Sequence, residues 1–437
     1  MAKYQQYAEY KDSGVEWLGK IPHGWKVLRG KYVFQEFRER STTGEEVLLS
    51  VSEYYGVKPR SEKISEGDHL SRAESLVDYK KCYKNDLVMN IMLAWKRGLG
   101  VSKYDGIVSP AYSVFRFNED IHPYFMHHLF RTDLYTSHFK TRSTGVIDSR
   151  LRLYPESFLD TEILIPSYKE QVHIANFLDH ETAQIDTLIE KQQTLIKLLK
   201  EKRQAVISHA VTKGLNPDAP MKDSGVEWLG EVPEHWTIKS YRYASEIYRG
   251  KFGHRPRNDP AFYDGEYPFI QTGDVARAGK VITSYSQTLN EKGKSVSQLF
   301  PSGTLMMAIA ANIGDTAILG FEAYAPDSVV GFKPYKGVDI EFLRYSFLAA
   351  LPAFEQTSTQ STQANLNVDR IGAVKGAFPS FDEQKKIVSY LDKMLEHYEA
   401  IEVKVNEQIQ LMQERRTALI SAAVTGKIDV RGWEAPD

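Results

Sequence analysis

Apolar residues recur at a spacing of seven, with polar interruptions, in one long segment of this chain. Residues Ser167–Thr212 run for roughly 45 positions without proline or glycine, so nothing in the sequence interrupts a helix. A heptad spacing of apolar residues on such a helix predicts a coiled-coil stripe. The two rows expected to form this stripe are Leu178, Ile185, Gln192, Leu199 and Val206, and Glu181, Leu188, Leu195, Lys202 and His209.

The same pattern returns near the other end of the chain. Each predicted helix is on the order of 65–70 Å long at 1.5 Å per residue, which suits a spacer. Lys202 and Arg415 occupy corresponding row positions, so a parallel pairing of the helices would bring two cations together. An antiparallel pairing avoids this repulsion and is the predicted arrangement. The rows of the second helix are Leu391, Tyr398, Val405, Met412 and Leu419, and Met394, Ile401, Gln408, Arg415 and Ala422.

A different pattern fills the stretches 10–165 and 221–378. Short runs of β-branched and aromatic residues alternate there with Gly, Asn, Asp and Pro turn signals. These stretches are predicted to be α+β modules, each with a substantial antiparallel sheet. The predicted organisation is a first module at 1–165, a central helix at 166–213, a second module at 214–378, a C-terminal helix at 379–426 and a tail at 427–437.

The two halves of the chain repeat each other. KDSGVEWLGKIPHGW at 11–25 and KDSGVEWLGEVPEHW at 222–236 are identical at 11 of 15 positions. IPSYKEQ at 165–171 and FPSFDEQ at 378–384 begin a second repeat, which continues into the long helices. A shift of 211 residues is far longer than the roughly 20–50 residues of a solenoid repeat, so two pseudo-equivalent modules are predicted. The repeated tryptophans, interpreted as structural anchors, are Trp17, Trp25, Trp228 and Trp236.

Composition places the chain among ordinary globular proteins, with 42% hydrophobic and 26% charged residues. Cys82 is the single cysteine, which excludes an intrachain disulfide and fits a reducing compartment. No apolar run reaches the roughly 18 residues that span a bilayer, so the expected location is cytoplasmic. The formal net charge of −2 gives no general basic excess, yet residues 239–258 hold six Lys or Arg against one acid.

Sequence motifs for catalysis are absent or incomplete. Lys294 and Ser295 match the end of a phosphate-binding loop, but Thr288 stands where its first glycine belongs. Residues 259–262 read DPAF, a near miss to a loop that holds the target amine in certain methyltransferases. The histidines show no metal-ligand spacing. A binding role is therefore favoured over an enzymatic one.

These features together resemble the DNA-specificity subunit of type I restriction-modification systems. The resemblance covers nearly the whole chain and is carried by the duplicated GVEWLG segments, by IPSYKEQ and FPSFDEQ, and by the closing AAVTGKIDVRGW at 422–433. Three further segments are similar to family sequence: LLSVSEYYGVKPR at 48–60, NDLVMNIMLAWKRGLGVS at 85–102 and TQANLNVDRIGAVKGAFP at 362–379.

The resemblance implies that each module is a target-recognition domain reading one half of a split DNA site. It implies that the two helices pack as an antiparallel coiled coil that fixes the spacer between the halves. The implied subunit is not an enzyme and binds no cofactor itself. Its implied partners are double-stranded DNA, two modification subunits that methylate adenine N6 with S-adenosylmethionine, and two restriction subunits that use ATP and Mg²⁺; no membrane is involved.

Sequence-specific DNA recognition needs donors and acceptors at base edges, and cations or hydroxyls at phosphates. Turn-rich segments of both modules supply such groups. In the first module the candidates are Tyr54, Tyr55, Lys58, Arg60, Trp95, Lys96, Arg97, Ser143, Thr144 and Arg150. In the second they are Arg249, Lys251, His254, Arg255, Arg257, Gln271, Thr272, Asp274, Asn312, Ser358, Gln360, Thr362, Gln363 and Asn365.

Two other classes of protein stay open at this point. One is an autonomous methyltransferase or nuclease with divergent motifs, which S-adenosylmethionine binding or turnover by the isolated chain would reveal. The other is a coiled-coil scaffold whose repeated modules bind polypeptides. Failure to bind DNA in the presence of the partner subunits would favour the scaffold.

Overall fold

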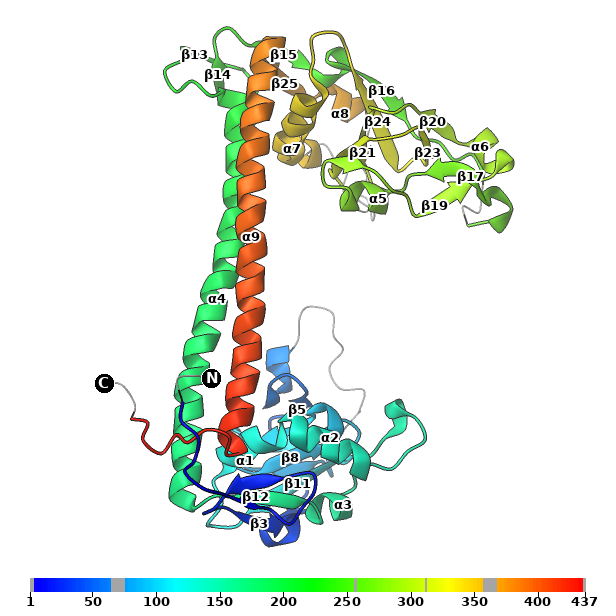
Figure 1. Cartoon of the computed structure of the whole chain (residues 1–437). Helices are drawn as coiled ribbons and strands as arrows, with labels where there is room; N and C mark the ends of the chain where they lie inside the picture. Colours follow the sequence, from blue (N-terminus) through cyan, green and yellow to red (C-terminus); the bar gives the residue numbers. More distant parts are fainter. Residues whose placement is uncertain (1–3, 64–74, 255–257, 311–312, 357–367, 435–437) are drawn as a thin grey trace. The chain divides into compact units, whose positions relative to one another are not determined.

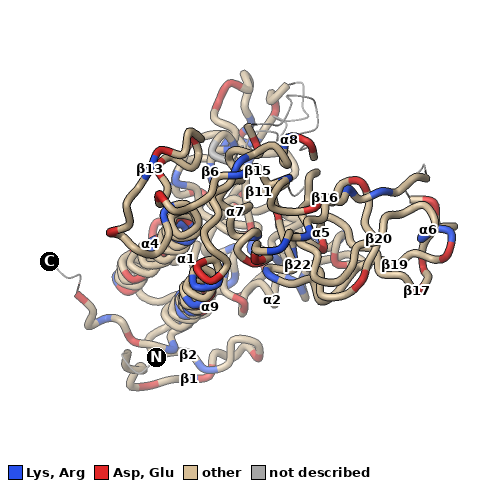
Figure 2. Tube along the Cα trace, turned by 90° about the horizontal axis from the view of Figure 1, so that it is seen from above, with Lys and Arg blue, Asp and Glu red and all other residues tan. Residues whose placement is uncertain are grey.

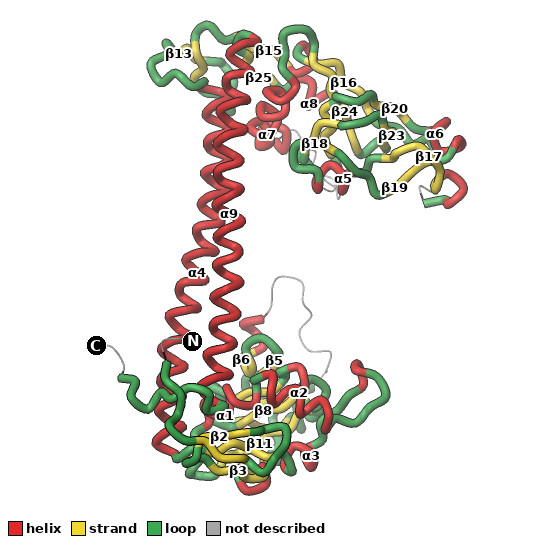
Figure 3. The backbone as a smooth tube through the Cα atoms, viewed as in Figure 1, coloured by secondary structure: helices red, strands yellow, loops and turns green. Residues whose placement is uncertain are grey.

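Strands and helices occur together in both halves of the chain, and two helices are far longer than the rest. The long helices are α4 (Tyr168–Lys213) and α9 (Phe381–Val424), drawn as the two longest coils in Figures 1 and 3. This mixture of elements confirms the predicted α+β class. The computed structural model describes residues 4–63, 75–254, 258–310, 313–356 and 368–434.

The chain divides into two compact units. The first unit comprises Met1–Gln192 with Glu407–Asp437, and the second comprises Gln193–Asn406. Each unit therefore contains one of the repeated modules together with part of α4 and part of α9. The modules are described one at a time below.

The module of the first unit is built from antiparallel strands around an aromatic core. Phe34, Phe115 and Phe158 lie against one another with ring centroids 5.0–5.4 Å apart. The largest sheet has the order β4 (Phe34–Phe37), β11 (Tyr112–Phe117), β8 (Leu87–Asn90) and β9 (Leu99–Val101). The remaining elements are β1 (Tyr10–Asp12), β2 (Lys20–Pro22), β3 (Lys26–Arg29), β5 (Leu49–Ser52), β6 (Gly56–Pro59), β7 (Lys80–Cys82), β10 (Gly106–Val108), β12 (Glu162–Ile165), α1 (Pro123–Phe130), α2 (Asp133–Arg142) and α3 (Pro155–Leu159).

The module of the second unit contains two larger sheets. One has the order β16 (Ser245–Arg249), β24 (Val329–Pro334), β21 (Leu305–Ala308), β22 (Thr316–Leu319) and β18 (Val281–Ile282). The other has the order β19 (Gln287–Leu289), β17 (Tyr263–Phe269), β23 (Ala323–Ala325) and β20 (Gln298–Phe300). Most strand pairs are antiparallel as predicted, and two are parallel, β17 with β23 and β18 with β22. The remaining elements are β13 (Met221–Asp223), β14 (Glu231–Pro233), β15 (Thr237–Ser240), β25 (Lys375–Phe378), α5 (Thr272–Arg277), α6 (Glu291–Val296), α7 (Ile340–Gln356) and α8 (Val368–Ala373).

In each module one of the repeated tryptophans hydrogen-bonds to the start of a long helix. Trp25 and Trp236 are each 1% exposed. The Nε1–H of Trp25 donates to Glu170 Oε1 at 3.0 Å, and that of Trp236 donates to Glu383 Oε1 at 3.1 Å. The predicted anchoring role is confirmed for Trp25 and Trp236. The repeated glutamate accepts the tryptophan N–H in both units. The other repeated tryptophans, which are partly buried, are Trp17 and Trp228.

The repeated glutamine that follows this glutamate makes a second joint. Gln171 and Gln384 are buried, and the Nε2 of each donates to the carbonyl of the proline five residues earlier, at 3.0 and 2.9 Å. The Oε1 of each accepts a backbone N–H of its own module, from His122 and Asp339 respectively, both at 2.8 Å. The EQ dipeptide is therefore repeated because it joins helix to module in both units.

Helices α4 and α9 pack against each other in both units, and the pairing is antiparallel. In the first unit, where the start of α4 meets the end of α9, the guanidinium of Arg416 donates to both carboxylate oxygens of Asp186 at 2.9 and 3.2 Å. In the second unit the opposite halves meet, and Lys200 Nζ lies 3.7 Å from Glu402 Oε1. These contacts confirm the predicted direction of pairing.

One predicted row of the stripe is displaced by one residue in each helix. Leu178 and Ile185 are buried as predicted, but Leu188 and Leu195 of the other row are 48% and 38% exposed. Ile189 packs inward in place of Leu188. In α9 the predicted row member Arg415 is likewise exposed. From Leu178 the inward-facing positions of α4 follow steps of four and then three residues. The leucine spacing predicted steps of three and then four.

Candidate nucleic-acid interface

The tyrosine turn, residues Glu53–Tyr55, joins β5 to β6 in the first module. Tyr54 is 84% exposed, and its backbone N–H donates to the Ser52 hydroxyl at 3.1 Å. The Lys58 ammonium lies 5.2 Å from the centre of the Tyr55 ring. Arg60 begins a 3-10 turn directly after β6. Four predicted residues therefore come from one hairpin, which presents an aromatic ring and cations to solvent.

The tryptophan turn, residues Ala94–Arg97, connects β8 to β9. Trp95 Nε1 donates to the Met92 carbonyl at 3.1 Å. The Lys96 and Lys140 ammonium groups lie 4.8 and 5.0 Å from the centre of the Trp95 ring. Arg97 has a left-handed backbone, with φ of +63°, and its side chain pairs with Asp133. The ring and its two lysines form a cationic aromatic surface of the kind that stacks on bases or contacts phosphates.

Arg131, at the end of α1, joins these two turns. Its guanidinium is the common donor to five backbone carbonyls, and burial lowers the pKa of Arg131 to about 10, which leaves it charged near neutral pH. Sequence reasoning missed this residue, because an arginine after a short helix gives no local signal. The five acceptors are the carbonyls of Ser52 (3.4 Å), Glu53 (2.9 Å), Tyr54 (3.0 Å), Arg97 (2.6 Å) and Leu99 (2.8 Å).

The third predicted segment is the 144–152 loop, which follows α2. Backbone bonds between Thr144 and Arg152, at 2.9 and 3.0 Å, close its base. The Ser143 hydroxyl donates to the Phe139 carbonyl at 2.7 Å, so it extends the helix end and is not left open for a ligand. Arg150 is exposed on the loop. Lys140 Nζ also bonds Asp148 of this loop at 2.8 Å, which brings the loop next to the tryptophan turn.

The basic run of the second module follows β16. Arg249 and Lys251 are exposed. The His254 ring stacks on Phe262 at 4.0 Å, and its Nε2 lies 3.1 Å from Asp259 Oδ2. His254 is therefore engaged within the module. Predicted residues that lie outside the described part of the chain are Arg255, Arg257, Asn312, Ser358, Gln360, Thr362, Gln363 and Asn365.

The predicted segment Gln271–Asp274 forms the start of α5. Asp274 is buried, its Oδ2 accepts the Gln271 backbone N–H at 2.9 Å, and its other oxygen pairs with Arg277. The carboxylate is thus used inside the module. Gln271 caps the helix, Thr272 is its first residue, and the side chain of Gln271 reaches across to Gln287 on β19. Sequence reasoning did not select Gln287, which lies 16 residues further along the chain.

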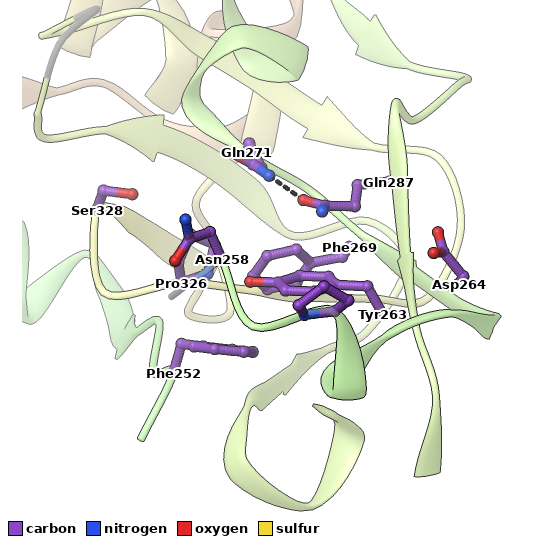
Figure 4. A pocket seen from close by; sticks show the side chains of 10 residues that line it. Phe252, Asn258, Tyr263, Asp264, Phe269, Gln271, Gln287, Pro326 and Ser328 are labelled. Atoms are coloured by element: carbon purple, nitrogen blue, oxygen red, sulfur yellow. Dashed lines mark hydrogen bonds between the residues drawn. The ribbon is translucent and has the colours of Figure 1, made fainter. Parts of the chain in front are cut away.

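A cavity of about 470 Å³ opens beside this glutamine pair, Gln271 and Gln287. Figure 4 shows the rings of Phe269 and Tyr263 on one side of it, with Asn258 and Ser328 across from Gln287. Phe269 is buried and belongs to a small aromatic cluster. The cavity therefore combines an apolar floor with amide and hydroxyl groups, the composition expected of a ligand site. The full lining is Phe252, Asn258, Pro260, Tyr263, Asp264, Phe269, Gln271, Gln287, Pro326 and Ser328.

The long helices do not carry a continuous basic face. Figure 2 shows Lys and Arg interspersed with Asp and Glu along α4 and α9. Among the described residues, no group of three or more His, Cys, Asp or Glu side chains is placed to hold a metal ion. A search of the same residues finds no helix both long and apolar enough to cross a membrane. The predicted DNA-contact residues that the structure describes all belong to the two modules.

Comparison with known proteins finds similarity to one kind of DNA-specificity protein. The model of the type I restriction modification DNA specificity domain matches residues 246–411. Along nearly its whole length the chain is also similar to the type I restriction enzyme EcoKI specificity subunit of Escherichia coli K12, with 22% identity over 95% of this chain and 92% of that protein. The chain is thus similar to the specificity subunits of type I restriction-modification systems.

A second specificity subunit and two solved structures are also similar to this chain. The StySPI specificity subunit of Salmonella potsdam is 22% identical over 95% of this chain and 92% of its own length. The crystal structure of the HsdS subunit from Thermoanaerobacter tengcongensis has a TM-score of 0.54 at 17% identity, covering 93% of this chain and 98% of that one. A structure from a study of complex assembly in a type I R-M system has a TM-score of 0.70 at 16% identity, covering 92% and 98%. These two structural likenesses establish the fold shared with the family.

Proposed function

We propose that this chain is the specificity subunit of a type I restriction-modification complex, in which each module reads one half of a split, asymmetric DNA site. The observation that carries the proposal is the way the two modules repeat. The repeated tryptophan, glutamate and glutamine residues are structural joints, whereas the tyrosine and tryptophan turns of the first module lie outside the repeated segments. A common frame with different loops suits two modules that read different base sequences.

The chemistry of the exposed turns supports DNA as the ligand. The tyrosine and tryptophan turns present aromatic rings with lysines beside them, and such groups contact bases and phosphates. Arg131 fixes both turns before any ligand arrives, which lowers the entropy lost on binding. Methylation of adenine requires the base to leave the helix, so a rigid reader that holds distorted DNA is useful to a methyltransferase.

The proposed partners are two modification subunits, which transfer a methyl group from S-adenosylmethionine to adenine N6, and two restriction subunits, which use ATP and Mg²⁺. In this proposal the chain catalyses no reaction and holds no cofactor. The net charge of −2 is consistent with partners that share the phosphate contacts. The antiparallel helices are proposed to set the unread spacer between the two half-sites.

The test is to express the chain together with the modification subunit of its own system and to map adenine N6 methylation across the host genome by single-molecule sequencing. The expected result is one split motif with a constant spacer. Expression of the modification subunit alone is the control and should give no such motif. A stable complex that adds no methylation and binds no DNA would overturn the proposal and favour a polypeptide-binding scaffold.

A further inference from the structure

Gln287 lies on the edge strand of a four-stranded sheet in the second module, and its side chain contacts the start of α5 through Gln271. It lies on β19, where the backbone pairing of Gln287 with Phe269 on β17 fixes its position. Its side chain is partly exposed at the rim of the 470 Å³ cavity. An amide that is placed by a strand, partly exposed and beside a cavity can reach a ligand that enters the cavity.

Hydrogen bonding fixes which way the glutamine pair is oriented. Gln271 caps α5, so its Oε1 already accepts the backbone N–H of Asp274. The Gln271 backbone N–H in turn donates to Asp274 Oδ2 at 2.9 Å, which closes the capping box. Gln271 therefore turns its Nε2 toward Gln287, and this group can only donate. Gln287 must accept this bond with its Oε1.

This orientation leaves Gln287 with free hydrogen-bonding capacity. An amide oxygen has two lone pairs and an amide nitrogen two N–H groups, and Gln271 uses one lone pair. Within the described residues, no other protein group bonds to the Gln287 side chain. Figure 4 shows its nitrogen on the side of the aromatic rings. Gln287 thus offers one acceptor and two donors in a fixed order beside the cavity.

We propose that Gln287 reads an adenine in the half-site of the second module, with Gln271 as its positioning residue. Adenine presents an N6 amino donor beside the N7 acceptor in the major groove, and a glutamine amide matches this pair with Oε1 and Nε2. The inference rests on the proposed function and adds to it the base that one side chain selects. Asn258 and Ser328, across the cavity, supply polar groups for the neighbouring base edge.

The test uses the complex of this chain with its modification subunit, and compares wild type with Gln287→Ala. Methylation mapping should show that one adenine position of one half-site accepts other bases in the variant, while the other positions and the spacer are unchanged. The wild-type preference at that position should correspond to about 5-fold to 150-fold in binding. A Gln287→Ala motif identical to wild type, or one degraded equally at all positions, overturns the inference.

Two further variants separate reading from folding. Gln271→Glu cannot donate, so the Gln287 amide must turn to donate to the new carboxylate, and the preference for adenine should fall although Gln287 is still present. Gln298→Ala is the matched control, because Gln298 lies on β20, at the opposite edge of the same four-stranded sheet. Its motif should equal wild type. Adenine preference unchanged in Gln271→Glu would exclude Gln271 as the positioning residue.

A base analogue tests the contact at the level of one atom. Replacing the selected adenine by 7-deazaadenine in a synthetic duplex removes N7, and the wild-type complex should bind this duplex at least about fivefold more weakly. Gln287→Ala should bind both duplexes equally. If wild type directs no split motif at all, the proposed function fails; if it directs the motif but ignores the analogue, the function stands and this inference fails.

Discussion

The two modules hold their candidate reading groups in place by different means. In the first, Arg131 donates to backbone carbonyls of two turns, so the turns are fixed and their side chains stay free. In the second, Gln271 donates to the side chain of Gln287, so one reading group is itself fixed. The first arrangement orders a surface and the second orders a single amide. In both modules protein hydrogen bonds hold candidate contact groups in place before a ligand binds. The donors, Arg131 and Gln271, are not repeated residues.

The contacts that join each module to its long helix are, by contrast, the same in both units. Trp25 with Glu170 and Trp236 with Glu383 make the same bond in each unit, at 3.0 and 3.1 Å. The residues that connect a module to its helix are therefore the same in both units, whereas Arg131 orders turns of the first module and Gln271 orders a side chain of the second. Equivalent changes at the two joints should therefore have equal effects, each in its own unit, whereas a change at Arg131 or Gln271 should affect one module only.

The largest expected effect on half-site recognition is from Arg131→Met. Loss of the guanidinium leaves five carbonyls without their donor, and we expect the first unit to lose about 3 kcal/mol of unfolding free energy. Recognition of one half-site should be lost and the other kept. Unit-resolved hydrogen exchange and methylation mapping measure the two effects.

Arg131→Lys is the matched variant for this comparison. Lysine keeps the charge but has three donors on one nitrogen, so it can serve one turn and not both. Its half-site should be weakened less than in Arg131→Met. Equal loss of both half-sites in either variant would show that Arg131 acts through general stability and not through its own module.

Gln171→Ala and Gln384→Ala should have equal effects, each in its own unit. Each substitution removes the partner of one backbone N–H and of two carbonyls, at a cost of about 1–3 kcal/mol. Chemical denaturation followed by hydrogen exchange in each unit checks this prediction. A cost more than twice as large in one unit would mean that the joints are not equivalent.

Acid should destabilise the first unit through His127 and His128. Burial holds the pKa of His127 well below its usual range and lowers that of His128 to about 3. The unfolded chain therefore binds more protons than the folded one below about pH 6.5, so stability falls as the pH falls, by up to about 1.4 kcal/mol per pH unit for each histidine. Denaturation at pH 7 and pH 5 measures the loss.

A variant with both histidines replaced by glutamine is the control for the acid effect. It should flatten the dependence of the first unit's stability on pH between about 7 and 5, because glutamine does not titrate. If the double variant kept the full slope, other groups would be responsible for it.

The smallest expected effect is from the ion pairs between the long helices. Arg416→Ala removes its pair with Asp186, whose side chain is about half exposed, and Glu402→Ala removes the 3.7 Å pair with Lys200. Each should change the unfolding free energy by less than about 1 kcal/mol. Neither should alter the bases of the methylated motif. A changed half-site in either variant would mean that the helices take part in reading.

The sequence predicted the features that depend on local pattern. Helices α4 and α9 follow from a long stretch without proline or glycine, and Trp25 was identified as an anchor because it is repeated. The second row of the stripe was misplaced, because Leu188 and Leu195 suggested the wrong order of three and four residue steps.

Features that depend on distant contacts could not be predicted. The acceptors of Arg131 lie between 32 and 79 residues earlier in the chain. The orientation of the Gln287 side chain depends on a hydrogen bond from Gln271, the helix cap 16 residues earlier. Asp274 was selected as a DNA contact from its place in a polar turn, yet its carboxylate is buried in the cap of α5. Residue type and turn context give no information about such partners.

The most direct test of one module for each half-site is competition binding on duplexes in which one half of the methylated motif is scrambled. Wild type, Arg131→Met and Gln287→Ala would each be measured in complex with the modification subunit. The account predicts that Arg131→Met becomes insensitive to scrambling of one half and Gln287→Ala loses part of its sensitivity to the other. Sensitivity to the same half in both variants, or to both halves equally, would contradict it.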